Sequence, residues 1–356
     1  MEPSLIASWP IALQVITFIV ALVVGVFCLV KFCDIFVDGS VALAKRAKIS
    51  PLIIGLTVVA IGTSCPELAV SVSDSISCLI NGGNANVAIG NVVGSNICNL
   101  LIVLGFSAIF TPIIVKKSIC KREYPFLIMV TAFCILFGIL FGINSVTKEY
   151  TVIDNYAIVR WEGIILTILC IVYILFLIYN AKKHPEDIDL EAEEEKELMP
   201  IWKMILFIIL GAAGVVLGGE LVVFGAKGLA LAASDAMHIN HDLAESLVGL
   251  TIVAVGTSLP ELVTSVVAAR KGQNEMALGN VIGSNIFNVL FVLGISATIN
   301  PLTTGSQIIV DLIVMGFATI AVFGIALTGK IKKWHGGLLL GMYAAYVTYL
   351  IIRTVI

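Results

Sequence analysis

The chain has 356 residues, of which 59% are hydrophobic and 13% are charged, and its mean hydropathy is +1.06. Because a soluble domain carries about 25% charged residues, this composition excludes an ordinary water-soluble protein, and we expect no nucleic-acid partner. The formal net charge of −3 says little about function, since the charges lie almost entirely between apolar stretches.

Ten apolar segments follow one another along the chain. A membrane-spanning helix needs about 20 mostly apolar residues, so the sequence predicts an all-α integral membrane protein with ten transmembrane helices. The predicted spans are 11–33, 51–80, 86–110, 124–143, 159–180, 203–232, 245–269, 275–299, 307–328 and 334–352.

The positive charges indicate an orientation. If the N-terminus lies outside, 16 Lys and Arg residues fall in inner loops and three in outer ones. Lys and Arg are enriched in cytoplasmic loops. We therefore expect a multi-pass protein of the cell membrane with both termini outside. The first span begins too close to Met1 for a cleavable signal peptide.

The second span contains GTSCPE, residues 62–67. Pro66 removes a backbone donor and Gly62 tolerates irregular backbone, so we expect two half-helices separated by a short break that frees the carbonyl near Ala60. Broken backbone at membrane depth is tolerated only where protein buries it or a water-filled cavity meets it.

Glu67 follows the break directly. Ser64 and Glu67 also fit a capping box, whose effect on stability is about 1 kcal/mol. A carboxylate at the bilayer centre costs about 2.5–3.5 kcal/mol on insertion scales, and glutamine would cap without the charge. We therefore interpret Glu67 as a functional residue, although a capping role is compatible with it.

The third span carries Asn91, Ser95 and Asn99 at every fourth position, which places them on one face of a helix. They are either cation ligands or polar contacts between helices, since Gly90 and Gly94 would let a neighbouring helix approach closely. We interpret the glycines as packing residues and Ser95 and Asn99 as ligands. The role of Asn91 stays open.

The segment 184–200 contains eight acidic residues. Such charge runs are usually disordered, which favours a cytoplasmic linker over a calcium-sensing segment. It divides the chain into a first five-helix unit (1–183), an acidic linker (184–202) and a second five-helix unit (203–356).

The second unit repeats the first. Residues 243–266 match 49–72, and residues 277–294 match 88–105. Because each unit has five spans, the second copy must enter the membrane from the opposite side, which is typical of secondary transporters. The sequence thus predicts two inverted repeats in which the second and seventh helices are broken.

Each candidate residue therefore has an equivalent in the second repeat. GTSLPE at 256–261 contains Glu261, and its expected free carbonyl lies near Ala254. Ser284 and Asn288 are assigned as ligands, and the role of Asn280 stays open. We expect Asn96 and Asn285 to point elsewhere and to bond the backbone.

The residue types indicate a hard cation. Such ions take about six to eight oxygen ligands. Two carboxylates neutralise one Ca²⁺, and without it they require Na⁺ or protons, which outlines an exchange mechanism. The eight cysteines and four histidines form no cluster that suggests Zn or Cu, and we expect no resident cofactor.

The blocks 49–110 and 243–300 resemble the α-repeats of the cation/Ca²⁺ exchanger superfamily, specifically the Na⁺/Ca²⁺ exchanger family. The resemblance implies alternating access, with the first and sixth helices sliding across a core of helices 2, 3, 7 and 8. It also implies a shared set of ligands for Ca²⁺ and Na⁺: the Glu67 and Glu261 carboxylates, backbone oxygens of Thr63 and Thr257, hydroxyls of Ser64, Ser258, Ser95 and Ser284, carbonyls of Ala60 and Ala254, and the Asn99 amide.

One position departs from the family pattern. Many Na⁺-coupled members carry Asp where this chain has Asn288, so its core holds two acids. The coupling ion, the stoichiometry and any K⁺ involvement are left open. Asp74, seven residues after Glu67, either attracts external cations or is an ordinary interfacial acid.

The sequence therefore predicts a membrane transporter rather than an enzyme, since it contains neither H-E-x-x-H nor G-x-S-x-G. The leading hypothesis is a Na⁺/Ca²⁺ antiporter, with the monomer as the functional unit in the lipid bilayer. The alternatives are a Ca²⁺/H⁺ antiporter and, in another class, a Ca²⁺-permeable cation channel.

Overall fold

A computed structural model describes residues 9–81, 86–140, 155–183, 199–236, 254–305 and 307–355. Within these residues, seven helices are long and apolar enough to cross a membrane, or eight if one bent pair forms a single span. Two of the ten predicted spans, 124–143 and 245–269, extend beyond the described residues. The acidic segment 184–198 and the first eight residues also lie outside them.

The elements of the first half follow the predicted spans. They are α1 (Ile11–Ala47), α2 (Pro51–Ile54), the π-helical turn η2 (Gly55–Val59), α3 (Ala60–Thr63), α4 (Cys65–Asn81), α5 (Asn86–Cys98), the π-helical turn η3 (Asn99–Val103), α6 (Leu104–Phe110), β1 (Ile113–Ile114), α7 (Lys117–Lys121), α8 (Glu123–Leu140), β2 (Asn155–Ile158) and α10 (Arg160–Lys183).

The second half is built in the same way where it is described. Its elements are α11 (Ile201–Ala236), α13 (Ala254–Thr257), α14 (Leu259–Arg270), α15 (Asn274–Phe287), the π-helical turn η6 (Asn288–Leu293), α16 (Gly294–Ile299), β3 (Leu302–Gly305), α17 (Ile308–Ala326), β4 (Lys330–Ile331) and α18 (Lys333–Val355).

The first helix is longer than expected. The predicted span ends at residue 33, whereas α1 has 37 residues and ends at Ala47. At 1.5 Å per residue it is about 55 Å long, well beyond the roughly 30 Å of a bilayer core. It ends where Lys48 takes a left-handed conformation, and Ser50 then caps α2 by accepting from the Ile53 amide at 3.4 Å.

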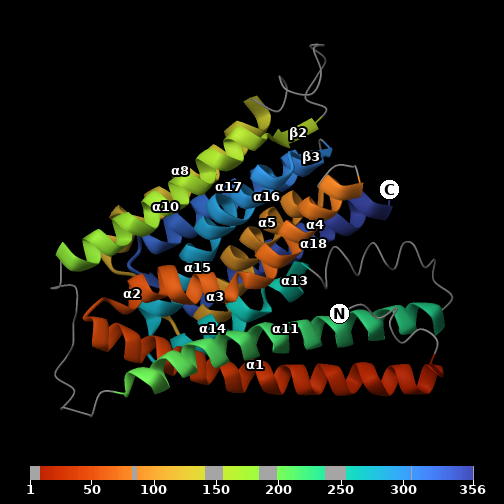
Figure 1. The fold of residues 1–356 in the computed structure, drawn as a ribbon, viewed down its shortest axis with the longest axis horizontal. Helices are drawn as coiled ribbons and strands as arrows, with labels where there is room; N and C mark the ends of the chain where they lie inside the picture. Colours follow the sequence, from red (N-terminus) through yellow and green to blue (C-terminus); the bar gives the residue numbers. More distant parts are fainter. Residues whose placement is uncertain are drawn as a thin grey trace.

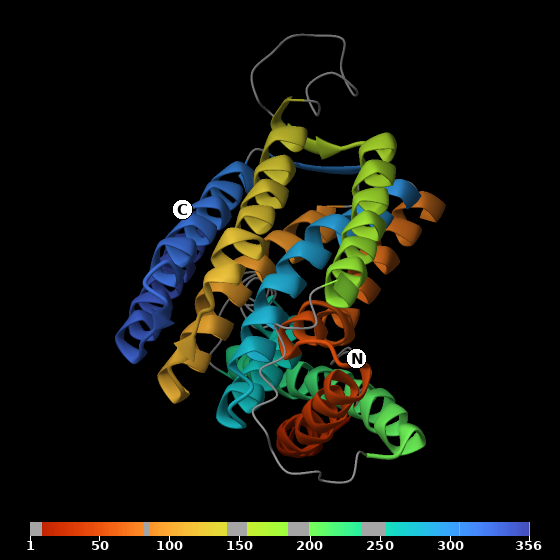
Figure 2. The ribbon, with the colours of Figure 1, turned by 90° about the vertical axis from the view of Figure 1, so that its left-hand side faces the viewer.

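The long helices α1 and α11 pack against each other in opposite directions along one side of the molecule (Figures 1 and 2). Glycines allow the close approach. A methyl group added at Gly25 would lie 2.8 Å from the Val222 backbone, and one added at Gly39 would lie 2.9 Å from Phe207. The outward faces are apolar, with Phe27 at 62% exposure and Leu217 at 58%, as expected for helices in contact with lipid.

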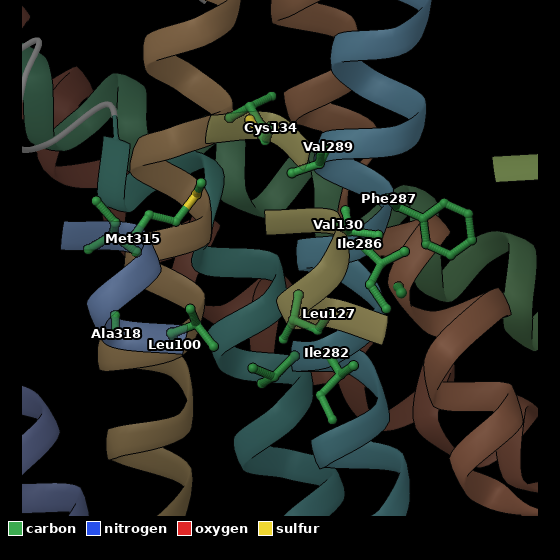
Figure 3. Close-up of a cluster of buried hydrophobic side chains, with 14 of the residues drawn as sticks. Leu100, Leu127, Val130, Cys134, Ile282, Ile286, Phe287, Val289, Met315 and Ala318 are labelled. Carbon is green, nitrogen blue, oxygen red and sulfur yellow. The ribbon is translucent and has the colours of Figure 1, made fainter. Parts of the chain in front are cut away.

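The remaining long helices form a second body, which lies at a steep angle to α1 and α11 (Figure 1). Its apolar core includes side chains from η3, α8, α15, η6 and α17 (Figure 3). The labelled residues are Leu100, Leu127, Val130, Cys134, Ile282, Ile286, Phe287, Val289, Met315 and Ala318. This body holds the equivalent segments of the two repeats against one another.

The predicted break in the second span is confirmed. The segment Pro51–Thr63 meets Cys65–Asn81 at an angle of 48°. In the second repeat, α13 ends at Thr257 and α14 begins at Leu259, so the helix is interrupted at the equivalent position. The first part of the predicted seventh span, up to residue 253, lies outside the described residues.

Close packing between repeats explains the glycines of α15, whereas the packing role predicted for Gly90 of α5 is wrong, because a methyl group there would meet nothing within 4 Å. A methyl group at Gly279 would lie 2.6 Å from the Leu52 carbonyl oxygen, and one at Gly283 would lie 2.8 Å from the Ala60 Cβ and 2.9 Å from the Leu56 backbone. The α15 backbone therefore lies directly against α2, η2 and α3.

We expect Gly283→Ala to lower the thermal stability of the purified protein, because the new methyl group has no space and overpacking costs about 1–3 kcal/mol. Gly324→Ala is the matched control, since a methyl group on that glycine of α17 meets nothing within 4 Å. Thermal melting in detergent compares the two variants. Equal melting temperatures would contradict the assigned contact.

Two short sheets join loops at the ends of the bundle. β1 pairs with β4 and β2 pairs with β3, both antiparallel. The charge count places the loops of β1 and β4 on the inner side and those of β2 and β3 on the outer side. Each sheet therefore joins two loops that the charge count predicts to lie on the same side of the membrane.

Candidate cation site

The two glutamates of the repeated motif occupy equivalent places. Glu67 lies in the first turn of α4 and Glu261 in the first turn of α14, each one residue after its proline. Both side chains are 0% exposed. The N-terminal end of a helix favours negative charge, so each second half-helix helps to hold its carboxylate at this depth.

Hydroxyl groups from both repeats surround Glu261. Ser64 Oγ donates to Glu261 Oε1 at 3.0 Å and Ser284 Oγ donates to the same oxygen at 3.5 Å. Ser64 belongs to the first repeat and Ser284 to the second. The motif Ser64-x-x-Glu67 therefore does not act locally as a capping box here, because Ser64 bonds the opposite glutamate.

The surroundings of Glu67 are similar, but its carboxylate oxygens are not hydrogen-bonded among the described residues. The hydroxyls of Ser95 and Thr257 lie beside its carboxylate and are 3.3 Å from each other. Glu67 is also close enough to Glu261 for the two charges to interact.

Several buried side-chain oxygens of the repeated motifs lack a hydrogen-bond partner among the described residues. They are Glu67 Oε1 and Oε2, Glu261 Oε2, Ser258 Oγ, Asn99 Oδ1 and Asn288 Oδ1. A buried, unpaired carboxylate is costly unless something compensates its charge. Hard cations such as Ca²⁺ take about six to eight oxygens of these types, so this donor set fits a cation better than it fits a purely structural network.

Two asparagines hold the glutamate backbones in the same manner. Asn91 Nδ2 donates to the Glu67 carbonyl at 3.2 Å, and Asn280 Nδ2 donates to the Glu261 carbonyl at 3.4 Å. Asn280 Oδ1 also accepts from Thr63 Oγ1 at 3.1 Å. The sequence left the roles of Asn91 and Asn280 open, and these hydrogen bonds indicate that the two side-chain amides support the broken helices.

The sequence predicts a free backbone carbonyl at Ala60, and the structure shows that this prediction is wrong. Its oxygen accepts from the Ser64 amide at 3.0 Å and from Thr63 Oγ1 at 3.3 Å. The missing N–H of Pro66 removes the helical donor of the carbonyl four residues earlier, which is Gly62. The carbonyl whose donor is lost is therefore two residues further along the chain than expected.

The second copy of the motif, at residues 256–261, likewise lacks a capping box. Ser258 is the N-cap residue of α14, yet its side chain makes no capping hydrogen bond. Ser258 and Glu261 therefore do not form the capping box that their Ser-x-x-Glu spacing would allow. Ala254 and Thr257 are the first and last residues of the short helix α13. Thr257 Oγ1 lies 3.3 Å from Ser95 Oγ.

Asp74 lies apart from this cluster. Its Oδ2 accepts from the Ala88 amide at 3.3 Å, so it caps the first turn of α5. This contact favours the structural interpretation of Asp74 over a role in attracting external cations.

The structure adds a feature that the sequence pattern does not predict. The π-helical turns η3 and η6 begin at Asn99 and Asn288, which are equivalent positions of the two repeats. Such turns often occur at functional sites. The repeated GSN motif that precedes each turn is the available signal, but hydrophobic periodicity does not distinguish a π-turn from an α-helix.

Comparison with known proteins decides the family. The sequence profile described as "Sodium/calcium exchanger protein" matches residues 17–179 and 203–352. The chain belongs to the sodium/calcium exchanger family. The protein is therefore a multi-pass membrane antiporter of the Ca²⁺/cation exchanger superfamily.

Members of this exchanger family resemble the chain over most of its length. The putative antiporter CaxA of Alkalimonas amylolytica is 36% identical and covers 87% of this chain and 90% of its own. The sodium/calcium exchanger MaX1 of Methanosarcina acetivorans is 31% identical, covering 92% and 97%.

A solved structure of the sodium-calcium exchanger NCX_Mj, soaked with Na⁺ and Sr²⁺, superimposes on this exchanger with a TM-score of 0.74. It is 32% identical and covers 94% of this chain and 98% of that one. The structure therefore has the fold of a cation/Ca²⁺ exchanger, as the sequence resemblance implies.

Proposed function

We propose that this exchanger moves Ca²⁺ and Na⁺ in opposite directions across the membrane, with Glu67 and Glu261 as the shared ligands. The proposal rests on two neighbouring buried carboxylates, three of whose four oxygens have no hydrogen-bond partner among the described residues. Together the carboxylates neutralise one Ca²⁺ or two Na⁺. Because the site is costly without a compensating cation, release of one ion is coupled to binding of another.

The remaining ligands of the proposed site come from both repeats. Hydroxyls of Ser64, Ser95, Ser258 and Ser284, amide oxygens of Asn99 and Asn288, and backbone oxygens of Thr63, Thr257, Ala60 and Ala254 complete the set. Ala60 requires its oxygen to be shared with the hydrogen bonds already described. We propose ten transmembrane helices in two inverted repeats, with an acidic cytoplasmic linker and both termini outside.

The movement that gives alternating access is proposed for α1 and α11. These helices lie directly on the two breaks: a methyl group added at Gly62 would lie 2.9 Å from Phe36 of α1, and one added at Gly256 would overlap Val223 of α11. A shift of the α1–α11 pair would therefore change access to both half-helix ends at once.

Ion pairs fasten α1 to the core in the present arrangement. Lys271, which follows α14, lies 2.7 Å from Asp38 and 3.3 Å from Asp34. These side chains are partly exposed, so the pairs contribute little to stability. A sliding α1 can break them at small cost.

A Ca²⁺/H⁺ antiporter is the second candidate. Asn288 leaves two carboxylates in the described site instead of three, and two neighbouring buried carboxylates also favour proton binding because protonation removes their repulsion. Protons would then replace Na⁺ as the ions that compensate the site when Ca²⁺ leaves.

Flux measurements in proteoliposomes test these functions. Vesicles loaded with Na⁺ and diluted into Na⁺-free buffer containing ⁴⁵Ca²⁺, at equal pH on both sides, should accumulate Ca²⁺, whereas vesicles loaded with choline should not. Uptake driven only by a pH gradient would identify the Ca²⁺/H⁺ antiporter. Uptake with neither gradient would identify a channel and contradict exchange.

A further inference from the structure

Three asparagines form a chain of hydrogen bonds across the boundary between the repeats. Asn96 Nδ2, from α5, donates to the backbone carbonyl of Asn285 in α15 at 3.2 Å. Asn288 Nδ2, at the start of η6, donates to Asn96 Oδ1 at 3.0 Å. All three residues are at most 1% exposed, so water does not compete for these groups.

The direction of this chain follows from its first member. The Asn285 carbonyl oxygen is only an acceptor, so the Asn96 atom that faces it must be the donor, Nδ2. Asn96 then presents Oδ1 to Asn288, and Asn288 must answer with its own Nδ2. The remaining atom of Asn288 is consequently Oδ1, which is buried and has no hydrogen-bond partner among the described residues.

The equivalent pair, Asn285 and Asn99, is not connected by a side-chain hydrogen bond. Asn285 Nδ2 donates to the Val281 carbonyl of its own helix at 2.7 Å. Neither side-chain atom of Asn99 makes a hydrogen bond within the described residues. The two repeats therefore differ here: the Asn288 amide has a defined orientation, whereas nothing in the described contacts orients Asn99.

From this asymmetry we propose that Asn96 is a positioning residue, which turns the Asn288 amide so that its oxygen faces the cations. A freely rotating amide would present NH₂ hydrogens, which repel a cation, as readily as oxygen. Partners of metal-binding side chains commonly change metal affinity about 10- to 100-fold when removed. This inference rests on the proposed cation site.

Equilibrium binding of ⁴⁵Ca²⁺ to the full-length protein in detergent, with no ion gradient, tests the inference. In Asn96→Ala we expect Ca²⁺ affinity to fall about tenfold. The matched control is Asn285→Ala, which removes an equally buried amide at the equivalent position and should stay within about twofold of the wild type. Equal losses in the two variants would overturn the proposal.

A double-mutant cycle separates positioning from a general structural role. If Asn96 acts through Asn288, adding Asn96→Ala to Asn288→Ala should change Ca²⁺ affinity by no more than about twofold. An undiminished effect in that background would overturn the proposal. If Asn96→Ala does not fold, Asn96→Leu fills the same space without hydrogen-bonding atoms and is compared with Asn285→Leu.

Flux in proteoliposomes distinguishes this inference from the proposed function. Asn96→Ala should raise the Ca²⁺ concentration for half-maximal Na⁺-driven uptake about tenfold, while uptake at saturating Ca²⁺ falls much less. Absent exchange in the wild type would contradict the proposed function alone, because the binding assay does not depend on coupling. Normal exchange with unchanged Ca²⁺ binding in Asn96→Ala would contradict the inference alone.

Discussion

Glu67→Gln and Glu261→Gln are each expected to abolish Ca²⁺ transport while leaving the fold intact. Glutamine keeps the shape of the side chain, and in Glu261→Gln its oxygen can still accept from Ser64 and Ser284. Breaking a buried charge pair costs about 3–5 kcal/mol. Since about 1.4 kcal/mol is a factor of ten, Ca²⁺ affinity should fall by about two to three and a half orders of magnitude.

Two measurements check this expectation: ⁴⁵Ca²⁺ uptake into proteoliposomes and the rise in melting temperature on adding Ca²⁺. A ligand that binds only the folded state stabilises it, by about 2.7 kcal/mol at 100 times its dissociation constant. The wild type should show this stabilisation, and both glutamine variants should lose it.

Glu162→Gln is the matched control for the two site variants. Glu162 is likewise 0% exposed, but it accepts from the Val159 amide at the start of α10, and glutamine can accept the same bond. It should transport Ca²⁺ normally. Wild-type transport by Glu67→Gln or Glu261→Gln would refute the assignment of these residues as ligands.

Asn288→Asp is expected to shift ion preference toward Na⁺. A third carboxylate leaves one negative charge uncompensated when Ca²⁺ is bound, whereas an additional Na⁺ restores neutrality. Two unit charges 4 Å apart interact by about 4 kcal/mol at an effective dielectric constant of 20. Desolvation offsets part of this, so we expect the half-saturating Na⁺ concentration to fall by about tenfold.

The structure adds a second consequence of Asn288→Asp. An ionised aspartate has no hydrogen to donate to Asn96 Oδ1, so the amide chain from Asn285 is interrupted at its end. We therefore expect this variant to melt at a lower temperature than Asn99→Asp, whose side chain has no such hydrogen bond. Unchanged affinities for both Na⁺ and Ca²⁺ in Asn288→Asp would count against a ligand role.

Much of the candidate site can be predicted from the sequence because its motifs occur once in each repeat. The pairing of GTSCPE with GTSLPE selects the two glutamates, and the cost of a carboxylate at membrane depth favours a functional role for both. The recurrence of Ser95 and Asn99 as Ser284 and Asn288 selects the facing helices. These inferences need only local spacing and the rules of membrane insertion.

Other features depend on contacts between residues that are distant in the sequence. Ser64 fits a local capping box, yet it bonds Glu261 of the other repeat. The predicted bond from Asn96 to the backbone is confirmed, but the sequence does not predict its second bond, to Asn288. Each of these polar groups has several possible partners, and only the packing of the repeats selects one.

Composition, proline chemistry and the repeated motifs are enough to predict a multi-pass membrane protein, the break in its second span and its family. Tertiary structure alone decided which hydroxyl faces which carboxylate, that α1 continues to Ala47, and which asparagine is oriented. The reason is physical: a buried polar group must take the partner that packing places within reach, and in this exchanger that partner often belongs to the other repeat.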